Sequence, residues 1–244
     1  MKPGVGLPNL VEIWVYLSAT PLFGLTLTLV AYVAADALYQ RFDKHPFVNP
    51  VLISVSAIVA VLAFSGVPYR QYFEGAQFVH FLLGTATVAL AVPLARLWSE
   101  LRERALPLLL AVLLGGTASV ILAVGTARLL GASDVFVASL VAKSVTAPIA
   151  VGIAEQVGGS PTLAAVFTLM TGIVGALVAT PLLNALGLKD WSARGFAVGV
   201  AAHGMGTARA FSVHPRAGAY ASLAMGLHGI LGALLLPLAG KLIL

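Results

Sequence analysis

The sequence lacks two features on which many soluble proteins depend. It has no cysteine among its 244 residues, and only 9% of them are charged. Without cysteine, disulfide bonds and thiolate metal sites are excluded. Because soluble domains carry about 25% charged residues, so little charge cannot cover a water-soluble surface. We therefore expect much of the apolar surface to face lipid.

Sequence patterns for several other activities are also missing. The five histidines do not have HExxH spacing, and there is no GxSxG motif, carboxylate pair or nucleotide-binding loop. We therefore expect no enzyme active site, no metal and no organic cofactor. The formal net charge is +5, but the basic residues are scattered along loops. This pattern favours topology signalling and contact with lipid headgroups, and no nucleic acid partner is expected.

Long apolar runs dominate what the sequence does contain. Hydrophobic residues make up 59% of the chain, and the mean hydropathy is +0.99. A helix needs roughly 20 residues to cross a bilayer, and a backbone in lipid must satisfy its own hydrogen bonds. The sequence thus predicts an all-α polytopic membrane protein. The expected apolar segments are residues 22–40, 49–65, 78–98, 105–130, 133–154, 160–187, 194–212 and 217–243.

Short connections between these segments predict a single membrane domain over residues 1–244. Within it, we expect residues 1–76 to form scaffold or dimer helices and residues 77–244 to form broken-helix units. If all eight segments cross the membrane, the loops carry seven basic residues on one side and six on the other. That division does not assign an orientation. The dense cluster from Arg96 to Arg104 favours a cytoplasmic location for its loop.

Two stretches of the sequence are nearly identical. Residues 172–177 read GIVGAL and residues 229–234 read GILGAL, so five of six positions match at an offset of 57. The same offset places Thr146 on His203. The match is either a coincidence in apolar sequence or a duplication of the kind found in secondary transporters. If it is a duplication and the broken segments are re-entrant, successive units have inverted orientations.

The fifth apolar segment contains the polar stretch KSVTAPIA at residues 143–150. A lysine inside a membrane costs about 2.5–3.5 kcal/mol and usually marks a substrate or ion path. Pro148 removes a backbone N–H and should free carbonyl groups near Ser144. The hydroxyls of Ser144 and Thr146 can bind those groups or a ligand. The alternative is a proline kink with Lys143 reaching toward the membrane interface.

The seventh segment contains a second polar stretch, AAHGMGTAR at residues 201–209. Gly204 and Gly206 each weaken a helix by roughly 1 kcal/mol and permit an unwound stretch that approaches a ligand. Arg209 offers a planar fork suited to a carboxylate. His203 can titrate near neutral pH and couple transport to protons. The alternative places Arg209 at the end of the segment, in the headgroup layer.

Two weaker features complete the candidate site. Thr85 and Thr87 form a third polar cluster, although threonines in helices often bond only to a carbonyl of the preceding turn. Glu155 is either an interfacial carboxylate or the counter-charge of Lys143 or of a coupling cation. The whole set of expected ligand-binding residues is Lys143, Ser144, Thr146, Pro148, His203, Gly204, Gly206, Thr207 and Arg209, with Thr85 and Thr87 from the weaker cluster.

Four stretches together resemble the LrgB/CidB family. They are HFLLGTATVALAVPL at 80–94, KSVTAPIA at 143–150, EQVGGSP at 155–161 and AHGMGTARA at 202–210. The stretches extend over nearly the whole chain, in the expected order and with the expected spacing. The sequence departs from the family at Thr85, where many relatives have proline, and this departure weakens the case for a backbone break in the third segment.

The resemblance implies two competing functions in the cytoplasmic membrane of a bacterium. One is an antiholin- or holin-like regulator of murein hydrolase export and cell lysis, acting with a small LrgA/CidA-type membrane protein. The other is an ion-gradient-driven transporter of small monocarboxylates such as glycolate, glycerate or pyruvate, like the plastidial glycolate/glycerate transporter. Cations and hydroxyls at helix breaks favour transport, because a holin needs a wide lesion and not a cation site.

We expect the carboxylate to bind at the bilayer midplane between the tips of the two broken segments, near the positive ends of half-helices. Lys143 or Arg209 would neutralise it, while Ser144, Thr146 and Thr207 would hydrogen-bond its second oxygen. Alternating access would move the broken-helix unit against the early helices, which we expect to form a homodimer. The coupling ion would be H⁺ or Na⁺.

Overall fold

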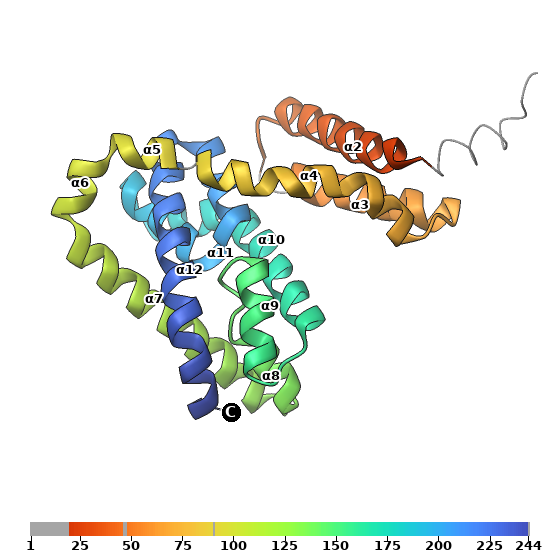
Figure 1. The fold of residues 1–244 in the computed structure, drawn as a ribbon. Helices are drawn as coiled ribbons and strands as arrows, with labels where there is room; N and C mark the ends of the chain where they lie inside the picture. The colour runs from red at the N-terminus through yellow and green to blue at the C-terminus, as the bar shows by residue number, and fades with distance from the viewer. Residues whose placement is uncertain (1–19, 46–47, 90, 244) are drawn as a thin grey trace, which may run out of the picture. The chain divides into compact units, whose positions relative to one another are not determined.

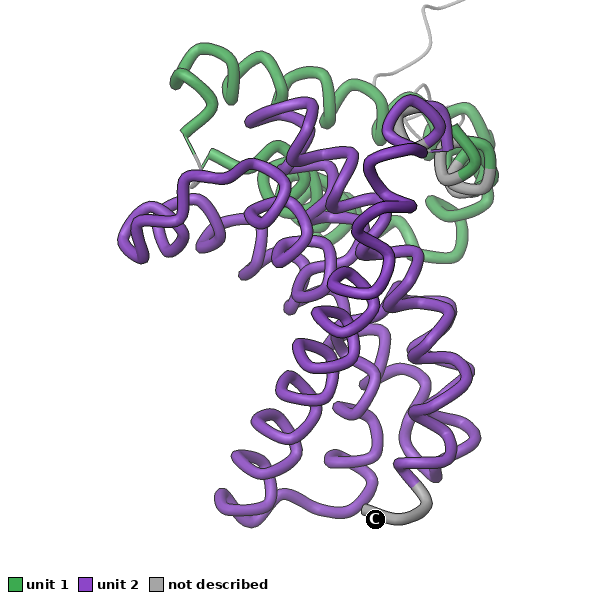
Figure 2. The backbone as a smooth tube through the Cα atoms, turned by 90° about the vertical axis from the view of Figure 1, so that its left-hand side faces the viewer, with its two compact units in different colours: residues 1–89 green, residues 90–244 purple. Residues whose placement is uncertain are grey.

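The structure is a computed structural model that describes residues 20–45, 48–89 and 91–243. Every regular element in these ranges is an α-helix, so the predicted all-helical fold is confirmed. The chain divides into two compact units, residues 1–89 and residues 90–244 (Figure 2). The predicted division after residue 76 falls inside a helix of the first unit and stays a prediction.

Four described helices are long and apolar enough to cross a membrane. They are Pro21–Arg41, Ala105–Leu129, Pro161–Ala185 and the Pro215–Gly240 part of the last helix. The protein is therefore a helical membrane protein, but the predicted count of eight membrane segments is not confirmed.

The first unit contains three described helices. They are α2 (Pro21–Arg41), α3 (Pro50–Ser65) and α4 (Tyr69–Ala89). The side chain of Asn49 caps α3 by accepting bonds from two backbone N–H groups, and Gly66 ends this helix with a φ of 69°. The predicted segment 78–98 covers the end of α4 and a short helix that begins at Ala91, with residue 90 outside the described part, so its continuity stays a prediction.

The second unit is built around three long helices (Figure 1). Its elements are α5 (Ala91–Arg96), α6 (Trp98–Glu103), α7 (Ala105–Leu129), α8 (Asp134–Leu140), α9 (Ala147–Gln156), α10 (Pro161–Ala185), α11 (Trp191–Val213) and α12 (Pro215–Ile243). The long helices are α7, α10 and α12, and the remaining elements pack around them.

Helix α11 is a hairpin of two half-helices. Its backbone is non-helical at Ala202 (φ −131°, ψ 18°) and at His203 (φ 40°, ψ −133°). The rings of Trp191 and His214, at opposite ends of the sequence segment, stack with their centroids 4.7 Å apart. Past the turn, a Cβ added to Gly206 would lie 2.9 Å from Cγ1 of Val198. The segment therefore enters the bundle, turns back at His203 and leaves beside its entry point.

The pair α8 and α9 also forms a hairpin, with its turn at residues 141–146. It comes first in the chain and is called the first hairpin below, and the α11 hairpin is called the second. The first hairpin starts beside the C-terminal end of α7, where Arg128 forms an ion pair with Asp134. It ends beside the C-terminal end of α12, where a Cβ added to Gly240 would lie 2.6 Å from Cγ1 of Val157. The predicted segments 133–154 and 194–212 are thus hairpins and not continuous helices.

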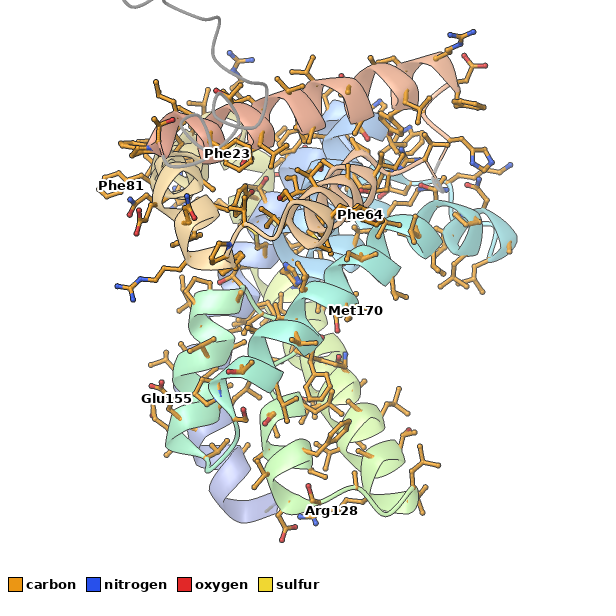
Figure 3. The ribbon with its side chains drawn as sticks, turned by 90° about the vertical axis from the view of Figure 1, so that its right-hand side faces the viewer. Phe23, Phe64, Phe81, Arg128, Glu155 and Met170 are labelled. Atoms are coloured by element: carbon orange, nitrogen blue, oxygen red, sulfur yellow. The ribbon has the colours of Figure 1, made fainter. Side chains whose placement is uncertain are left out.

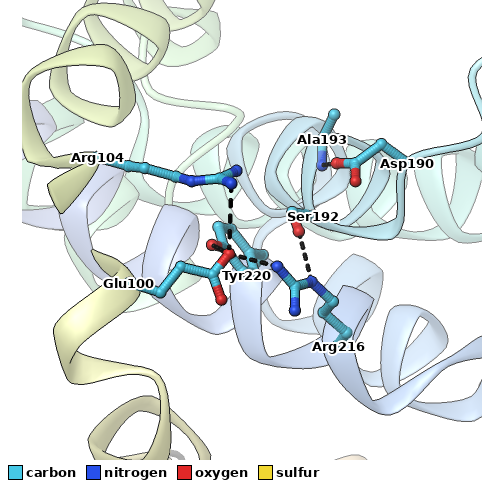
Figure 4. A network of polar contacts seen from close by, with 7 residues as sticks. All are labelled: Glu100, Arg104, Asp190, Ser192, Ala193, Arg216 and Tyr220. Atoms are coloured by element: carbon cyan, nitrogen blue, oxygen red, sulfur yellow. Dashed lines mark hydrogen bonds and ion pairs between the residues drawn. The ribbon is translucent and has the colours of Figure 1, made fainter. Parts of the chain in front are cut away.

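A polar network fixes the mouth of the α11 hairpin at the N-terminal end of α12 (Figure 4). Nε of Arg216 donates to Oγ of Ser192 at 2.7 Å, and the guanidinium group also pairs with Glu100 of α6. Glu100 accepts a further bond of 2.7 Å from the hydroxyl of Tyr220. Since α8 and α9 are anchored at the other end of α12, the two hairpins enter the unit from opposite ends (Figure 1).

Glycines permit α11 to lie directly against α12. A Cβ added to Gly195 would lie 2.0 Å from the carbonyl oxygen of Ala217, and one added to Gly199 would lie 2.2 Å from that of Ala221. No side chain larger than hydrogen fits at either position. The Gly195-x-x-x-Gly199 spacing is typical of such contacts, because two small residues one turn apart let helix backbones approach closely.

Candidate functional site

Lys143 lies at the turn of the first hairpin and points toward α7. Its Nζ donates to Oγ of Ser119 and to Oγ of Ser144, each at 3.0 Å. The two hydroxyl oxygens are 2.9 Å apart, and Ser144 is only 5% exposed. The ammonium group is therefore held inside the unit by two hydroxyls and does not extend to an interface.

No carboxylate balances this lysine in the part of the chain that the structure describes. The ion pairs found there join Arg104 and Arg216 to Glu100, and Arg128 to Asp134. A partly buried cation without an anion is costly, because neither water nor a counter-charge compensates for its lost hydration. The site therefore favours an anionic ligand.

Pro148 and Thr146 have different roles from those predicted. Pro148 lies in the first turn of α9 and is exposed, so it begins this helix and does not kink one. Its missing N–H costs nothing there, since the first-turn N–H groups have no helical partner. Thr146 is the N-cap residue, but its side chain makes no capping bond. Ser144 bonds to side chains and does not bond to freed carbonyl groups.

The second hairpin turns at His203, and the glycines that follow remain helical. A positive φ is rare for a residue with a side chain, and two hydrogen bonds hold His203 in this conformation. Its Nε2 lies 2.9 Å from the carbonyl oxygen of Thr168. Its own carbonyl oxygen accepts a hydrogen bond of 2.8 Å from the hydroxyl of Thr207. The prediction that the helix unwinds at Gly204 and Gly206 is wrong, because both residues are helical. Gly206 instead permits close packing, since a Cβ added to it would lie 2.7 Å from Cβ of Ala202.

The two copies of the repeated hexapeptide each receive one hairpin tip. On α10, a Cβ added to Gly175 would lie 2.3 Å from Cβ of Ala202. On α12, a Cβ added to Gly232 would lie 2.8 Å from Cγ1 of Val145. Gly232 lies 57 residues after Gly175 in the sequence, and Val145 lies 57 residues before Ala202. The repeat therefore marks equivalent packing surfaces in the fold.

Both tips also contact the same stretch of α12. The hydroxyl oxygen of Thr207 lies 3.9 Å from Sδ of Met225. Ile149 lies against Gly229, since a Cβ added to this glycine would be 3.1 Å from Cδ1 of Ile149. Between these contacts is His228, which lies within electrostatic range of both Lys143 and His203. The middle of the unit thus gathers three basic side chains from three elements.

The structure leaves several predicted site residues away from this centre. Arg209 lines a small pocket with Trp191 and Arg194 at the mouth of the α11 hairpin, about 9 Å along the helix from His203. Glu155 is exposed on the last turn of α9, at the end remote from the tip (Figure 3). Neither residue is brought beside Lys143.

The weaker threonine cluster belongs to the first unit. Thr85 is exposed, and its hydroxyl donates to the carbonyl of Leu82 at 2.8 Å. This is the local bond given above as the alternative to ligand binding. The side chain of Thr87 lies outside the described part of the structure, so its predicted role stays a prediction.

Sequence reasoning missed three residues that contact the tips. Ser119 belongs to the stretch GGTAS on α7, whose small residues indicate only helix packing. Thr168 contributes through its backbone, which leaves no sequence signal. His228 immediately precedes the second hexapeptide, and this position beside a repeat is the one signal that could have identified it.

Comparison with known proteins assigns the chain to a family. The LrgB-like family matches residues 28–242. The chain is 30% identical over 211 residues to the holin-like protein CidB of Staphylococcus epidermidis, covering 86% of this chain and 92% of CidB. It is 33% identical over 207 residues to the uncharacterized protein YwbG of Bacillus subtilis, covering 85% and 92%. YxaC of the same organism is 35% identical over 212 residues, covering 87% and 92%. No solved structure matches. The chain therefore belongs to the LrgB-like family, as its sequence motifs predict.

Proposed function

We propose that this protein transports small monocarboxylates across the bacterial cytoplasmic membrane. The observation that carries the proposal is Lys143, held inside the unit by two hydroxyls without a carboxylate partner among the described residues. An ammonium group has three N–H donors, and Ser119 and Ser144 accept two of them. A substrate carboxylate would accept the third and supply the missing negative charge.

A groove gives a ligand access to this lysine. Lys143 and Ser119 line a space of about 520 Å³ between α7 and α8, whose walls include Leu122, Leu130 and Phe136. The groove is apolar except near the lysine and at Thr126. A small monocarboxylate fits this distribution, with its charge at Lys143 and its carbon chain along the wall.

The arrangement of the hairpins supports alternating access. Each tip packs on one copy of the hexapeptide, and the hairpins enter from opposite ends. We propose that the unit arose by duplication as an inverted repeat, a design in which substrates bind where the repeats meet. Rocking of one hairpin and its supporting helix against the other would expose Lys143 to each side in turn.

This topology also predicts an orientation. Among residues 91–243, seven basic residues lie at the end with the mouth of the α11 hairpin, namely Arg96, Arg102, Arg104, Lys189, Arg194, Arg209 and Arg216. The other end has only Arg128 and Lys241. By the positive-inside rule the first end is cytoplasmic.

Cysteine labelling in intact cells checks this orientation, and the absence of native cysteine removes any background. Gln156 and Lys189 are both exposed, at opposite ends of the second unit. We expect a membrane-impermeant maleimide to label Gln156→Cys but to label Lys189→Cys only after the cells are permeabilised. Labelling of both variants in intact cells, or of neither, would contradict two hairpins that open to opposite sides.

A holin-like function is the second candidate. The name of one relative, the holin-like protein CidB, supports this function more directly than it supports transport. In this case a small LrgA/CidA-type protein would be the partner and the chain would oligomerise. The homodimer expected for a transporter is likewise a prediction.

Reconstitution into liposomes distinguishes the two functions. We expect the purified protein to take up labelled glycolate or pyruvate with saturable kinetics while trapped carboxyfluorescein is retained, because a closed bundle passes only the ligand that fits its site. Release of the dye without saturable uptake would reject transport in favour of the holin-like function. Liposomes without protein provide the baseline for both measurements.

A further inference from the structure

His228 is a buried titratable residue that none of the contacts described so far explains. It is 6% exposed, on the stretch of α12 that both hairpin tips contact. Its Nδ1 is buried and has no hydrogen-bond partner among the described residues. Buried polar atoms in proteins are nearly always paired, so an unpaired ring nitrogen indicates a group that binds something during the functional cycle.

The imidazole borders a cavity. His228 lines a space of about 220 Å³ between α7 and α12, together with Gly116, Thr117 and Gly232. This volume exceeds the roughly 10–15 Å³ that one water requires, and the Thr117 hydroxyl and the imidazole are the polar side-chain groups on its wall. The ring packs tightly at one point, because a Cβ added to Gly116 would lie 3.0 Å from its Cε1. The ring is therefore fixed in place next to an open space.

Among the described residues, the charged groups that act on His228 are basic. Lys143 at the first hairpin turn and His203 at the tip of the second both lie within electrostatic range of it, while the cavity wall on α7 carries no charged residue. Protonation of His228 would therefore place a second positive charge near Lys143, at a cost that a bound carboxylate would offset. A metal cation such as Na⁺ would meet the same repulsion without gaining an anionic protein ligand.

His203 is the other candidate for proton binding, and its geometry argues against it. Its Nε2 is already bonded to the carbonyl of Thr168, and the residue forms the turn of the hairpin at a positive φ. To donate to a carbonyl, this Nε2 must already carry a hydrogen, so it cannot accept the proton, and Nδ1 of His203 is not among the buried unpaired atoms found in the described residues. His228 lies in a regular helix and has one ring nitrogen without a partner.

We propose that His228 binds the proton that is transported together with the carboxylate. When the carboxylate occupies the site beside Lys143, one proton from the same side binds Nδ1 of His228, and the imidazole becomes an imidazolium. Release of the carboxylate on the other side removes the stabilising negative charge, so the proton leaves on that side. This inference rests on the proposed transport function and deepens it by assigning the coupling ion and its binding residue.

The test separates coupled from uncoupled transport in proteoliposomes. Wild type, His228→Gln and the control His214→Gln are compared for accumulation of labelled carboxylate driven by an acidic exterior, and for counterflow at equal pH on both sides. His214 is a matched control because it stacks on Trp191 at the mouth of a hairpin, away from the tips. We expect His228→Gln to lose accumulation by at least tenfold and to keep counterflow, whereas His214→Gln behaves as wild type.

Each other result has a defined meaning. Accumulation by His228→Gln at the wild-type level would overturn the assignment, and so would loss of counterflow in a folded variant, because a residue that only carries the proton is dispensable for exchange. If the His228→Gln variant does not fold, the His228→Asn variant is used in its place. The side-chain amide of asparagine occupies the position of the histidine Nδ1. A wild-type protein without counterflow would reject the transport function itself, before any question about His228 arises.

Discussion

Replacing Lys143 with methionine is expected to lower carboxylate uptake strongly and to leave the protein at least as resistant to heat as the wild type. Methionine fills a similar volume without a charge. The change removes a partly buried cation that lacks a described counter-ion, and buried charges are often replaced by apolar groups without loss of stability. It also removes a charge-assisted hydrogen bond to the ligand, worth about 1.5–3 kcal/mol, and tenfold in affinity corresponds to about 1.4 kcal/mol.

The measurement pairs initial uptake rates in proteoliposomes with thermal unfolding in detergent. Uptake by Lys143→Met should fall by roughly 10- to 100-fold at subsaturating substrate. The control Lys189→Met removes an exposed lysine outside the helices and should change neither quantity. A strong loss of melting temperature in Lys143→Met would assign the lysine a structural role, through its bonds to Ser119 and Ser144. Uptake at the wild-type rate would remove Lys143 from the site.

Substituting alanine for Gly175 should damage the tip of the second hairpin. The added Cβ would lie 2.3 Å from Cβ of Ala202, a contact with no flexible atoms to yield. Overpacking of this kind costs about 1–3 kcal/mol, and 1 kcal/mol shifts the melting temperature of a domain of 150–250 residues by roughly 2–4 °C. We expect a lower melting temperature. We also expect a loss of uptake larger than the loss of stability alone would cause, because the turn at His203 could no longer pack against α10.

Two further glycine variants make the comparison specific. Gly232→Ala changes the equivalent position on α12, where the neighbouring atom is a movable methyl group of Val145, 2.8 Å from the added Cβ, so its effect should be smaller. Gly226→Ala, on the same helix with no atom within 4 Å, should be neutral or stabilising by up to about 1 kcal/mol. Equal effects of Gly175→Ala and Gly226→Ala would contradict the tight seat of the tip.

The broken segments could be located from the sequence because their signal is local. Lys143 and the stretch around His203 are polar interruptions in apolar runs, and hydropathy alone identifies them. The position of each break within its stretch could not be predicted in the same way. Pro148 suggested a kink but begins a helix, and Gly204 was expected to unwind while His203 carries the positive φ. The conformation at His203 depends on its contact with α10, where the carbonyl of Thr168 bonds to the imidazole.

The hexapeptide repeat shows which structural features a sequence pattern can predict and which it cannot. Its offset of 57 correctly relates the Gly175 contact to that of Gly232. A pattern of this kind does not reveal that each copy supports a hairpin tip, since Ala202 and Val145 are unremarkable apolar residues. The charge count assumed that all eight apolar segments cross the membrane, whereas two of those segments are hairpins in the structure.

Amino-acid composition and hydropathy determined that this protein is a helical membrane protein with a lysine inside an apolar run and two interrupted segments. Those properties depend on the transfer of side chains and backbone into lipid, which each residue contributes locally. The protein's sequence motifs, and not its composition, pointed to the LrgB-like family. Only the tertiary structure decided that the interrupted segments turn back, that Ser119 bonds to Lys143, and that His228, and not Arg209, lies near that lysine. Distances between residues remote in the sequence depend on turn conformations and on which glycines let two helices meet, and neither is set by the polarity of a single segment.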